Sequence, residues 1–468
     1  MRMRDLRPRS RRGNRQGIFP FMIKLGERED VTARAGLPLV VETMCALELD
    51  QEARDLLPAS ARASDFGPEE KLAALVTLIA AGGDRIEDIR ILSEDRGLMR
   101  LFGHPLPSPD ALLDFLGEFH DPLCWAKRPA GKKAFVPPES SGLVALEAIN
   151  RALVLRGSAR TATVATIDHD GTIIESHRRG MLVAYEGTRG AQPLCAVWAE
   201  EQLIVSDEFR DGNVAGGEDP LSSARRAFNN LPTWVTERRF RADSASYYTP
   251  LLKYLVGESI GFCISADMSK QLRAVCQALP QSAWSLMEQR ESAAVDLAEV
   301  EFAPGDWRRD QAPLRYVAIR ITPQQTELFS AAPGPMYFAV VSNRHEMTAA
   351  DLVQWHREKA GTIEHVHRVM KDELGAGVMP SQRFGANAAW FRINAITFNL
   401  LTVLKRRALP ERYRLARPKR LRYELFTLPG KLAIHQGQVS VSISASDERG
   451  HEIVAARQRL LRLLDPAA

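Results

Sequence analysis

The feature that most constrains how this chain can fold is a change of pattern near residue 160. Residues 161–177 (TATVATIDHDGTIIESH) are rich in β-branched side chains and bounded by turn residues, which predicts a strand. The segments QPLCAVWAEE and QLIVSDEFRDGN predict the next two strands of an antiparallel meander. Helical and strand patterns then alternate up to residue 279, beginning with a helix at Asp219 and Pro220. We therefore expect an α/β fold with a mixed sheet, in which three antiparallel strands precede alternating helices and strands.

The segments around this core differ in composition. The N-terminal residues are rich in arginine and predict a basic flexible arm. Helical patterns such as PEEKLAALVTLIAAG follow, and they predict a helical domain that either binds DNA or serves only for packing. A segment rich in Pro, Gly and Lys then predicts a linker. The expected organisation is an arm at 1–29, a helical domain at 30–125, a linker at 126–142, an α/β core at 143–296 and 346–405, a β-rich insertion at 297–345 and a basic C-terminal region at 406–468. Within the second part of the core, a long helix is expected to begin at Thr348 and to stop at Gly375.

Cysteine content and charge narrow the class of protein. The five cysteines are scattered without C-x-x-C spacing, which argues against a disulfide framework or a zinc site and fits a reducing compartment. The 62 basic and 58 acidic residues leave a net charge of +4, a weak preference for anionic partners. The longest apolar stretch, Leu72–Ala81, is far shorter than the roughly 20 residues of a membrane helix, so we expect no membrane partner.

Four acidic residues occupy positions where chemistry is commonly placed. Asp168 and Asp170 are two residues apart on the first predicted strand and therefore share one face of it. Asp243 ends the strand RFRAD, and Glu364 lies inside the long predicted helix. Carboxylates from separate elements can converge on hard divalent ions such as Mg²⁺, and a pair of such ions can promote phosphoryl transfer.

The segments TIDHDGT, EFRDGN, RFRADS and KAGTIEHVHRVMKDELG, in this order, resemble the DDE transposases of bacterial insertion sequences. Within that family the chain is similar to the branch with a β-rich insertion before the glutamate. The resemblance implies a ribonuclease-H-like fold and a catalytic triad of Asp170, Asp243 and Glu364, with Asp168 left open as an alternative first metal ligand. It also implies a pair of Mg²⁺ ions, for which Mn²⁺ can substitute, and cleavage and transfer of DNA strands at the terminal inverted repeats of an element. The implied partners are double-stranded DNA and a second copy of the chain, in the nucleoid of a bacterial cytoplasm.

The same branch carries a Tyr-Arg-Glu-Lys signature around the glutamate, which the chain matches only in part. Lys371 lies seven residues after Glu364 on the same helix face and fits the signature lysine. Ala360 stands in place of the arginine, and Arg357 in place of the tyrosine. We expect Arg357 or Lys359 to supply the missing phosphate contact.

Further DNA contacts are expected outside the signature. Arg210 and Asn213 lie in the RDGN turn that closes the third strand, and Trp307 could either stack on a flipped base or belong to a core. The segment after residue 404 is densely basic with interleaved tyrosines, which favours contact with a phosphate backbone over a solvated surface. Its first basic residues are Lys405, Arg406 and Arg407.

Two other functions compete with the transposase. The segment IDHDGTI matches the D-x-D-G-T motif of haloacid-dehalogenase-like phosphatases, in which Asp168 would be the nucleophile and Asp170 the acid and base. That fold needs strand and helix in alternation directly after the motif, whereas two further strands are predicted here. The third alternative is a transposase relic that binds element ends without cutting them.

Overall fold

The protein is described here by a computed structural model that covers residues 29–58, 65–129, 133–178, 180–184, 186–307, 312–323 and 334–464. All but the last residue of the predicted arm at 1–29 lies outside the described residues. Among the described ranges, no helix combines the length and the apolar character that a membrane crossing needs.

A nine-stranded mixed sheet forms the centre of the molecule, in the order β10-β11-β12-β13-β9-β8-β2-β6-β7. The strands β2 (Val164–Gly171), β6 (Leu194–Trp198) and β7 (Leu203–Glu208) are antiparallel neighbours, and they correspond to the predicted meander. On its other side β2 pairs in parallel with β8 (Glu237–Ala242), which pairs in parallel with β9 (Gly261–Ser265). The mixed α/β sheet expected from the sequence is thus present.

The connections between these strands follow the predicted alternation. The helix α9 (Pro220–Asn229) precedes β8, and Asp219 caps it by accepting the amide of Ser222 at 3.2 Å. The helix α10 (Thr249–Gly257) precedes β9, and α11 (Lys270–Ala278) follows it. Parallel neighbours need such crossovers, because a short turn cannot return the chain to the same end of the sheet.

A small second sheet interrupts the meander between β2 and β6. Its strands are β3 (Ile174–Glu175), β5 (Arg189–Ala191) and β4 (Leu182–Val183), where the sequence pattern predicted one strand continuing to residue 177. The backbones approach closely here, because a Cβ at Gly190 would lie 1.9 Å from the carbonyl oxygen of Ile174. Only glycine therefore fits at this crossing.

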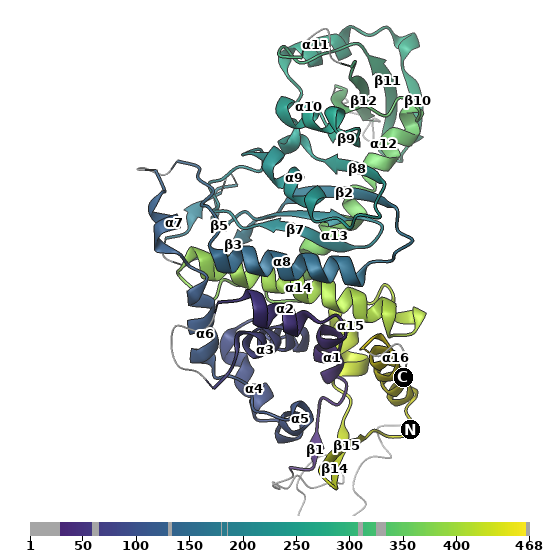
Figure 1. The fold of residues 1–468 in the computed structure, drawn as a ribbon. Helices are drawn as coiled ribbons and strands as arrows, with labels where there is room; N and C mark the ends of the chain where they lie inside the picture. Colours follow the sequence, from purple (N-terminus) through teal and green to yellow (C-terminus); the bar gives the residue numbers. More distant parts are fainter. Residues whose placement is uncertain are drawn as a thin grey trace, which may run out of the picture.

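The β-rich insertion extends the central sheet instead of standing apart from it. Its strands are β10 (Ser285–Gln289), β11 (Ala293–Val300), β12 (Arg315–Pro323) and β13 (Met336–Ser342), so its first strand begins at 285 and not near 297. The last strand pairs antiparallel with β9, through Val340–Ser265 and its neighbours, and so covers the open edge of the parallel strands. These strands form the upper part of the molecule in Figure 1.

The long helix predicted from Thr348 to Gly375 is divided in two. The helix α12 (Ala349–Arg357) begins after Thr348, whose hydroxyl accepts the amide of Asp351 at 3.1 Å. Glu358 separates it from α13 (Lys359–Asp372), which ends three residues before the predicted stop.

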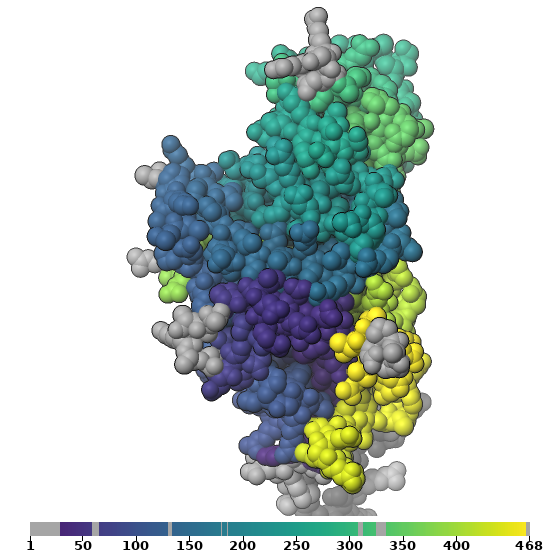
Figure 2. All heavy atoms as spheres, viewed as in Figure 1, coloured from purple at the N-terminus to yellow at the C-terminus, as the bar shows by residue number. Residues whose placement is uncertain are grey.

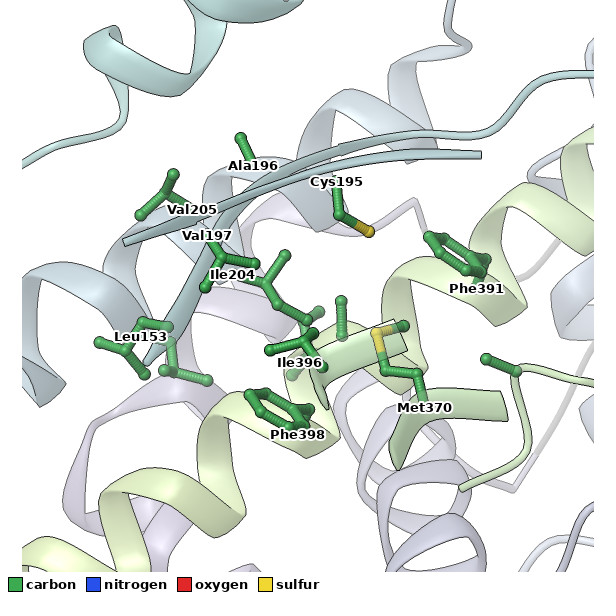
Figure 3. Packing of buried hydrophobic residues seen from close by; sticks show 14 of the residues in the cluster. Leu153, Cys195, Ala196, Val197, Ile204, Val205, Met370, Phe391, Ile396 and Phe398 are labelled. Atoms are coloured by element: carbon green, nitrogen blue, oxygen red, sulfur yellow. The ribbon is translucent and has the colours of Figure 1, made fainter. Parts of the chain in front are cut away.

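Two long helices run side by side beneath the meander: α8 (Ser141–Gly157) and α14 (Phe384–Arg407) (Figure 1). Figure 3 shows Val197 and Ile204 of the sheet close to Ile396 and Phe398 of α14 in a shared apolar core. Asn399 on α14 is buried within this core, where its side chain accepts the amide of Ile204 at 2.8 Å and donates to the carbonyl of that residue at 2.8 Å. A buried polar side chain bonded in this way fixes the helix along the strand.

The N-terminal helices pack against the C-terminal part of the chain below α14. The bounds are α1 (Pro38–Ala46), α2 (Leu49–Leu56), α3 (Pro68–Ala81), α4 (Ile89–Ser93), α5 (Arg96–Phe102) and α6 (Pro109–Glu118) on one side, and α15 (Pro418–Leu421) and α16 (Glu448–Leu464) on the other. The helix α7 (Pro122–Ala126) lies apart from this group, at the start of α14, where Trp125 stacks on Phe384 (Figure 1). A small sheet joins the two sides, because β1 (Val31–Thr32) pairs with the hairpin of β14 (Gly430–His435) and β15 (Gln438–Ser442). Figure 2 shows the C-terminal segment in yellow against the N-terminal helices in purple. The regions predicted as separate at 30–125 and 406–468 therefore share one core.

Candidate active site

Asp170 and Asp243 lie side by side at the carboxyl ends of two parallel strands. The register of β2 and β8 pairs His169 with Ala242, so the next residue along each strand is one of the two aspartates. Burial raises the pKa of Asp243, and the nearby charge of Asp170 raises it further. The carboxyl ends of parallel strands are a common position for ligand sites in open α/β sheets. Two carboxylates that repel each other at this position favour a positive charge beside them.

Asp168 shares a face with Asp170, as predicted, but its carboxylate is occupied. It accepts hydrogen bonds from Arg241 Nε at 2.7 Å and Nη2 at 3.0 Å, and the hydroxyl of Thr362 also donates to it. The side chains of Asp168 and Arg241 are 0% and 3% exposed. Burial raises the pKa of Asp168, and the Arg241 guanidinium opposes that rise. This geometry favours Asp170 over Asp168 as the first carboxylate of a site.

Arg241 also fixes the junction between α12 and α13. Its Nη1 donates to the carbonyl of Trp355 at 2.6 Å and lies 3.0 Å from Glu358 Oε2. The same guanidinium therefore binds β2, the end of α12 and the residue between the two helices. With Thr362 bound to Asp168, the first turn of α13 is held against the end of β2.

Lys359, expected to contact DNA phosphate, turns inward to the acidic pair. Its Nζ lies 2.9 Å from Asp170 Oδ2, and its side chain is 10% exposed. A lysine is rarely buried to this extent unless its charge is paired. As placed, its ammonium is a partner of Asp170 and not part of the outer surface.

Glu364 is exposed on α13 and is not grouped with the two aspartates. It lies about 140° around the helix from Lys359, since each residue of an α-helix turns about 100°. Among the described residues, no three acidic, histidine or cysteine side chains are close enough together to enclose a metal ion. Lys371 shares the face of Glu364, and its Nζ donates to the carbonyl of Ile173 at 3.4 Å, just beyond the end of β2. Lys371 thus lies at the end of β2, two helical turns along α13 from Glu364.

Two buried histidines, His169 and His367, lie near the site. His169 points to the opposite face of β2, where its ring nitrogens lie 2.9 Å from Ser223 Oγ and 3.2 Å from Ser246 Oγ; burial lowers its pKa to about 3. His367 is buried under α13, where burial lowers its pKa to about 4, and its Nε2 has no hydrogen-bond partner among the described residues. Both rings are therefore neutral near pH 7, and neither adds to the positive charge of the site.

A cavity of about 440 Å³ opens beside Asp243. Strands β12 and β13 of the insertion line one side of it, where Phe338 is 46% exposed, and α12 contributes Arg357. Arg357 lies 3.0 Å from Glu288, and its side chain is 29% exposed. Among the residues expected to contact DNA, Arg357 lies beside the acidic pair and keeps part of its side chain exposed to solvent.

The other expected DNA contacts are engaged within the protein. Arg210 is fully buried and bonds Glu208 and the carbonyl of Ala215, while Asn213 follows in the same closed turn. Burial of the Arg210 guanidinium leaves it no access to a phosphate. Trp307 is partly buried against the core, with its indole N–H 3.2 Å from the carbonyl of Ala312.

Several basic side chains of the segment after residue 404, which was expected to contact a phosphate backbone, bind acidic side chains or backbone carbonyls of the protein. Lys405 donates to the carbonyl of Ala416 at 3.2 Å, and burial lowers its pKa to about 8. Arg406 pairs with Glu201 at 2.6 Å, and Arg407 donates to the carbonyl of Ser158 at 3.0 Å. Other cations of this segment keep exposed side chains. Among them, we call Arg414, Lys419 and Arg420 the outer basic surface.

Sequence reasoning missed Arg241 and the inward position of Lys359. A signal for Arg241 exists, because it lies two residues before Asp243 on a strand next to the one that carries Asp168. The position of Lys359 depends on the break between α12 and α13, and the helical pattern does not show that break.

Comparisons with known proteins place the chain in a family. A solved structure of a piggyBac transposase synaptic complex with hairpin DNA is similar, with a TM-score of 0.44 and 12% sequence identity over 84% of this chain and 79% of that chain. No curated protein sequence matches at a significant level. Residues 26–465 match the family described as Transposase DDE domain group 1, nearly the whole of the chain. The chain therefore belongs to the DDE transposases of this group.

Proposed function

We propose that the protein is a DNA transposase that binds the terminal inverted repeats of an insertion sequence and cleaves and transfers DNA strands. The observation that carries this proposal is the pair of Asp170 and Asp243 at neighbouring parallel strand ends, next to the helix that bears Glu364 and Lys371. Family membership over residues 26–465 supports the same chemistry.

The proposed catalytic core has a ribonuclease-H-like arrangement. Supporting this, three antiparallel strands lead into two parallel ones, in the order β7-β6-β2-β8-β9, with helices between the later strands. Asp170 lies at the end of β2, and Asp243 directly follows the last residue of β8. Two residues that are 73 positions apart in the sequence therefore lie next to each other at one edge of the sheet.

The donors at this edge suit magnesium. Asp170 and Asp243 offer carboxylate oxygens, which hard divalent cations prefer, and their mutual repulsion favours a bound positive charge. Glu364 on α13 would be the third carboxylate ligand. Because it is not grouped with the two aspartates, metal binding by all three requires a change in the position of this helix or of the Glu364 side chain. When bound, a pair of Mg²⁺ or Mn²⁺ ions would activate the attacking oxygen and stabilise the leaving one.

The remaining residues would hold the DNA. Water would attack a phosphodiester at the element end and free a 3′-hydroxyl, which would then attack the target strand by the same in-line displacement. Lys371, which lies at the end of β2, would bind one phosphate, and Arg357, which lines the cavity beside Asp243, would bind another. The outer basic surface would add sequence-independent affinity. Joining two ends would bring together two copies of the chain, in the cytoplasm of a bacterium.

The phosphatase alternative loses its nucleophile in this structure. Asp168 would have to attack a substrate phosphorus, but it is 0% exposed and both its oxygens are bound by Arg241. The next strands along the chain also do not fit, because β6 and β7 form an antiparallel meander with β2 where that fold needs strand and helix in alternation.

A nicking assay on DNA that carries the element ends tests the proposal. With Mg²⁺, we expect the wild type to release 3′-hydroxyl ends, and Asp243→Asn and Glu364→Gln to bind the DNA without cutting it. Asp372→Asn is a matched control, because it removes another exposed carboxylate from the same helix. Cutting at the wild-type rate by both active-site variants would refute the site, whereas binding without cutting by the wild type would favour the relic.

A further inference from the structure

We propose that Lys359 is a built-in counter-cation for the acidic pair, and that a divalent cation must displace its ammonium in order to bind there. The inference rests on the proposed function, because it concerns the same site. It assigns Lys359 a positioning role that neither the family match nor the sequence pattern suggests.

The ammonium group of Lys359 lies against the acidic pair. Lys359 Nζ lies 2.9 Å from Asp170 Oδ2, on the side of the helix that faces the sheet. Its charge acts on Asp243 and Asp168 as well as on Asp170. This positive charge therefore reduces the repulsion between Asp170 and Asp243 at the end of the sheet.

The backbone around Lys359 is held in place by contacts on both sides. On one side Glu358 lies 3.0 Å from Arg241, and on the other Thr362 donates to Asp168. Arg241 and Asp168 are themselves a buried bidentate pair. The start of α13 is thus held, and the direction of the Lys359 side chain toward Asp170 follows from the helix position.

The side chain of Lys359 can move although its backbone is held. The lysine stem has four methylene groups, so its Nζ can leave Asp170 by side-chain rotation while α13 stays in place. A divalent ion at Asp170 would repel the ammonium at short distance, and this repulsion favours departure of the ammonium from the carboxylate. Released in this way, the ammonium stays next to the acidic pair, where the DNA phosphate would have to lie.

The test measures Mn²⁺ binding to the full-length protein without DNA, by the electron paramagnetic resonance signal of free Mn²⁺. We expect Lys359→Met, which keeps the stem and removes the charge, to bind Mn²⁺ about tenfold more tightly than the wild type. Lys359→Arg keeps the charge and is expected to bind at the wild-type level or more weakly. Lys270→Met removes an exposed lysine on α11 and controls for net charge.

Thermal unfolding supplies a second readout. Without metal, Lys359→Met should unfold at a lower temperature than the wild type, because the acidic pair has lost its counter-charge. Saturating Mn²⁺ should raise its unfolding temperature more than that of the wild type, as tighter binding to the folded state requires.

Each outcome separates the two proposals. Unchanged or weaker Mn²⁺ binding by Lys359→Met, together with loss of binding in Asp170→Asn, overturns the role of Lys359 and leaves the metal site standing. Absence of any Asp170-dependent Mn²⁺ binding in wild type and variant overturns both.

Discussion

The buried ion pair between Arg241 and Asp168 gives the sharpest test of how the active-site end of the sheet is held together. Replacing Arg241 with Met leaves a carboxylate that is 0% exposed without its counter-ion. Loss of one partner from a buried pair costs about 3–5 kcal/mol of unfolding free energy. Replacing Asp168 with Asn should cost less, about 2 kcal/mol, because the guanidinium keeps the carbonyl of Trp355 and the carboxylate of Glu358.

The double variant Arg241→Met with Asp168→Asn separates the pair from general disruption. Because no buried charge of this pair then lacks a partner, the double variant should be about as stable as Asp168→Asn alone. The coupling energy is then about as large as the cost of Arg241→Met, about 3–5 kcal/mol. Urea unfolding followed by both tryptophan fluorescence and circular dichroism measures these values. Arg449→Met is the control: its pair with Asp447 at 2.6 Å is partly exposed, so its loss should cost under about 1 kcal/mol.

The pH dependence of the Arg241→Met deficit checks the cause. Burial already raises the pKa of Asp168, and loss of Arg241 raises it further. A carboxyl group whose folded pKa lies above its unfolded value destabilises the fold at high pH, and this effect is relieved as the pH falls through the folded pKa. The deficit should therefore shrink as the pH is lowered from neutral through the raised pKa of Asp168. Additive single-variant costs, or a deficit that grows on acidification, would refute the reasoning.

Three further predictions follow from single features of the structure. Burial lowers the pKa of His169 to about 3, so near pH 6.5 the unfolded chain binds a proton at this residue and the folded chain does not. The free energy of unfolding should therefore fall as the pH drops below about 6.5. In urea unfolding, His169→Gln should lose about 1 kcal/mol less than the wild type for each pH unit. Gly361→Ala on α13 meets nothing within 4 Å and should stabilise the protein by about 0.5–1 kcal/mol, whereas Gly385→Ala would place Cβ 2.3 Å from the carbonyl oxygen of Phe119 and should destabilise it by about 1–3 kcal/mol in the same assay. Neutralising the outer basic surface should weaken binding to any duplex and reduce the slope of log K against log salt by about 0.9 for each phosphate that the variant no longer neutralises, while an unchanged slope would exclude this surface from the DNA interface.

Much of the core could be predicted from local pattern alone. The three strands of the meander show alternating or continuous apolar residues bounded by turns, and Asp219 and Thr348 mark helix starts by their capping chemistry. Asp170 and Asp243 could be found because each ends a strand, and the family resemblance that these residues suggested agrees with the family match over residues 26–465.

Other features depended on partners far away in the chain. The insertion strands look like an independent unit until β13 is seen to pair with β9, because an edge strand does not encode locally which strand it joins. The basic residues after 404 look like a DNA-binding cluster until their partners, such as Glu201 for Arg406, are known. Ion pairs between distant residues leave no periodic trace in a sequence.

The sequence by itself determined that this is a mixed α/β protein with two aspartates at strand ends, because strand and helix periodicity and capping are short-range properties of neighbouring residues. Only the tertiary structure decided which aspartate stays open and which is bound by Arg241, and that Lys359 faces the open one while Glu364 does not. Those outcomes depend on the break at Glu358 and on how α13 is rotated against β2, and long-range packing and buried charge pairing set that rotation.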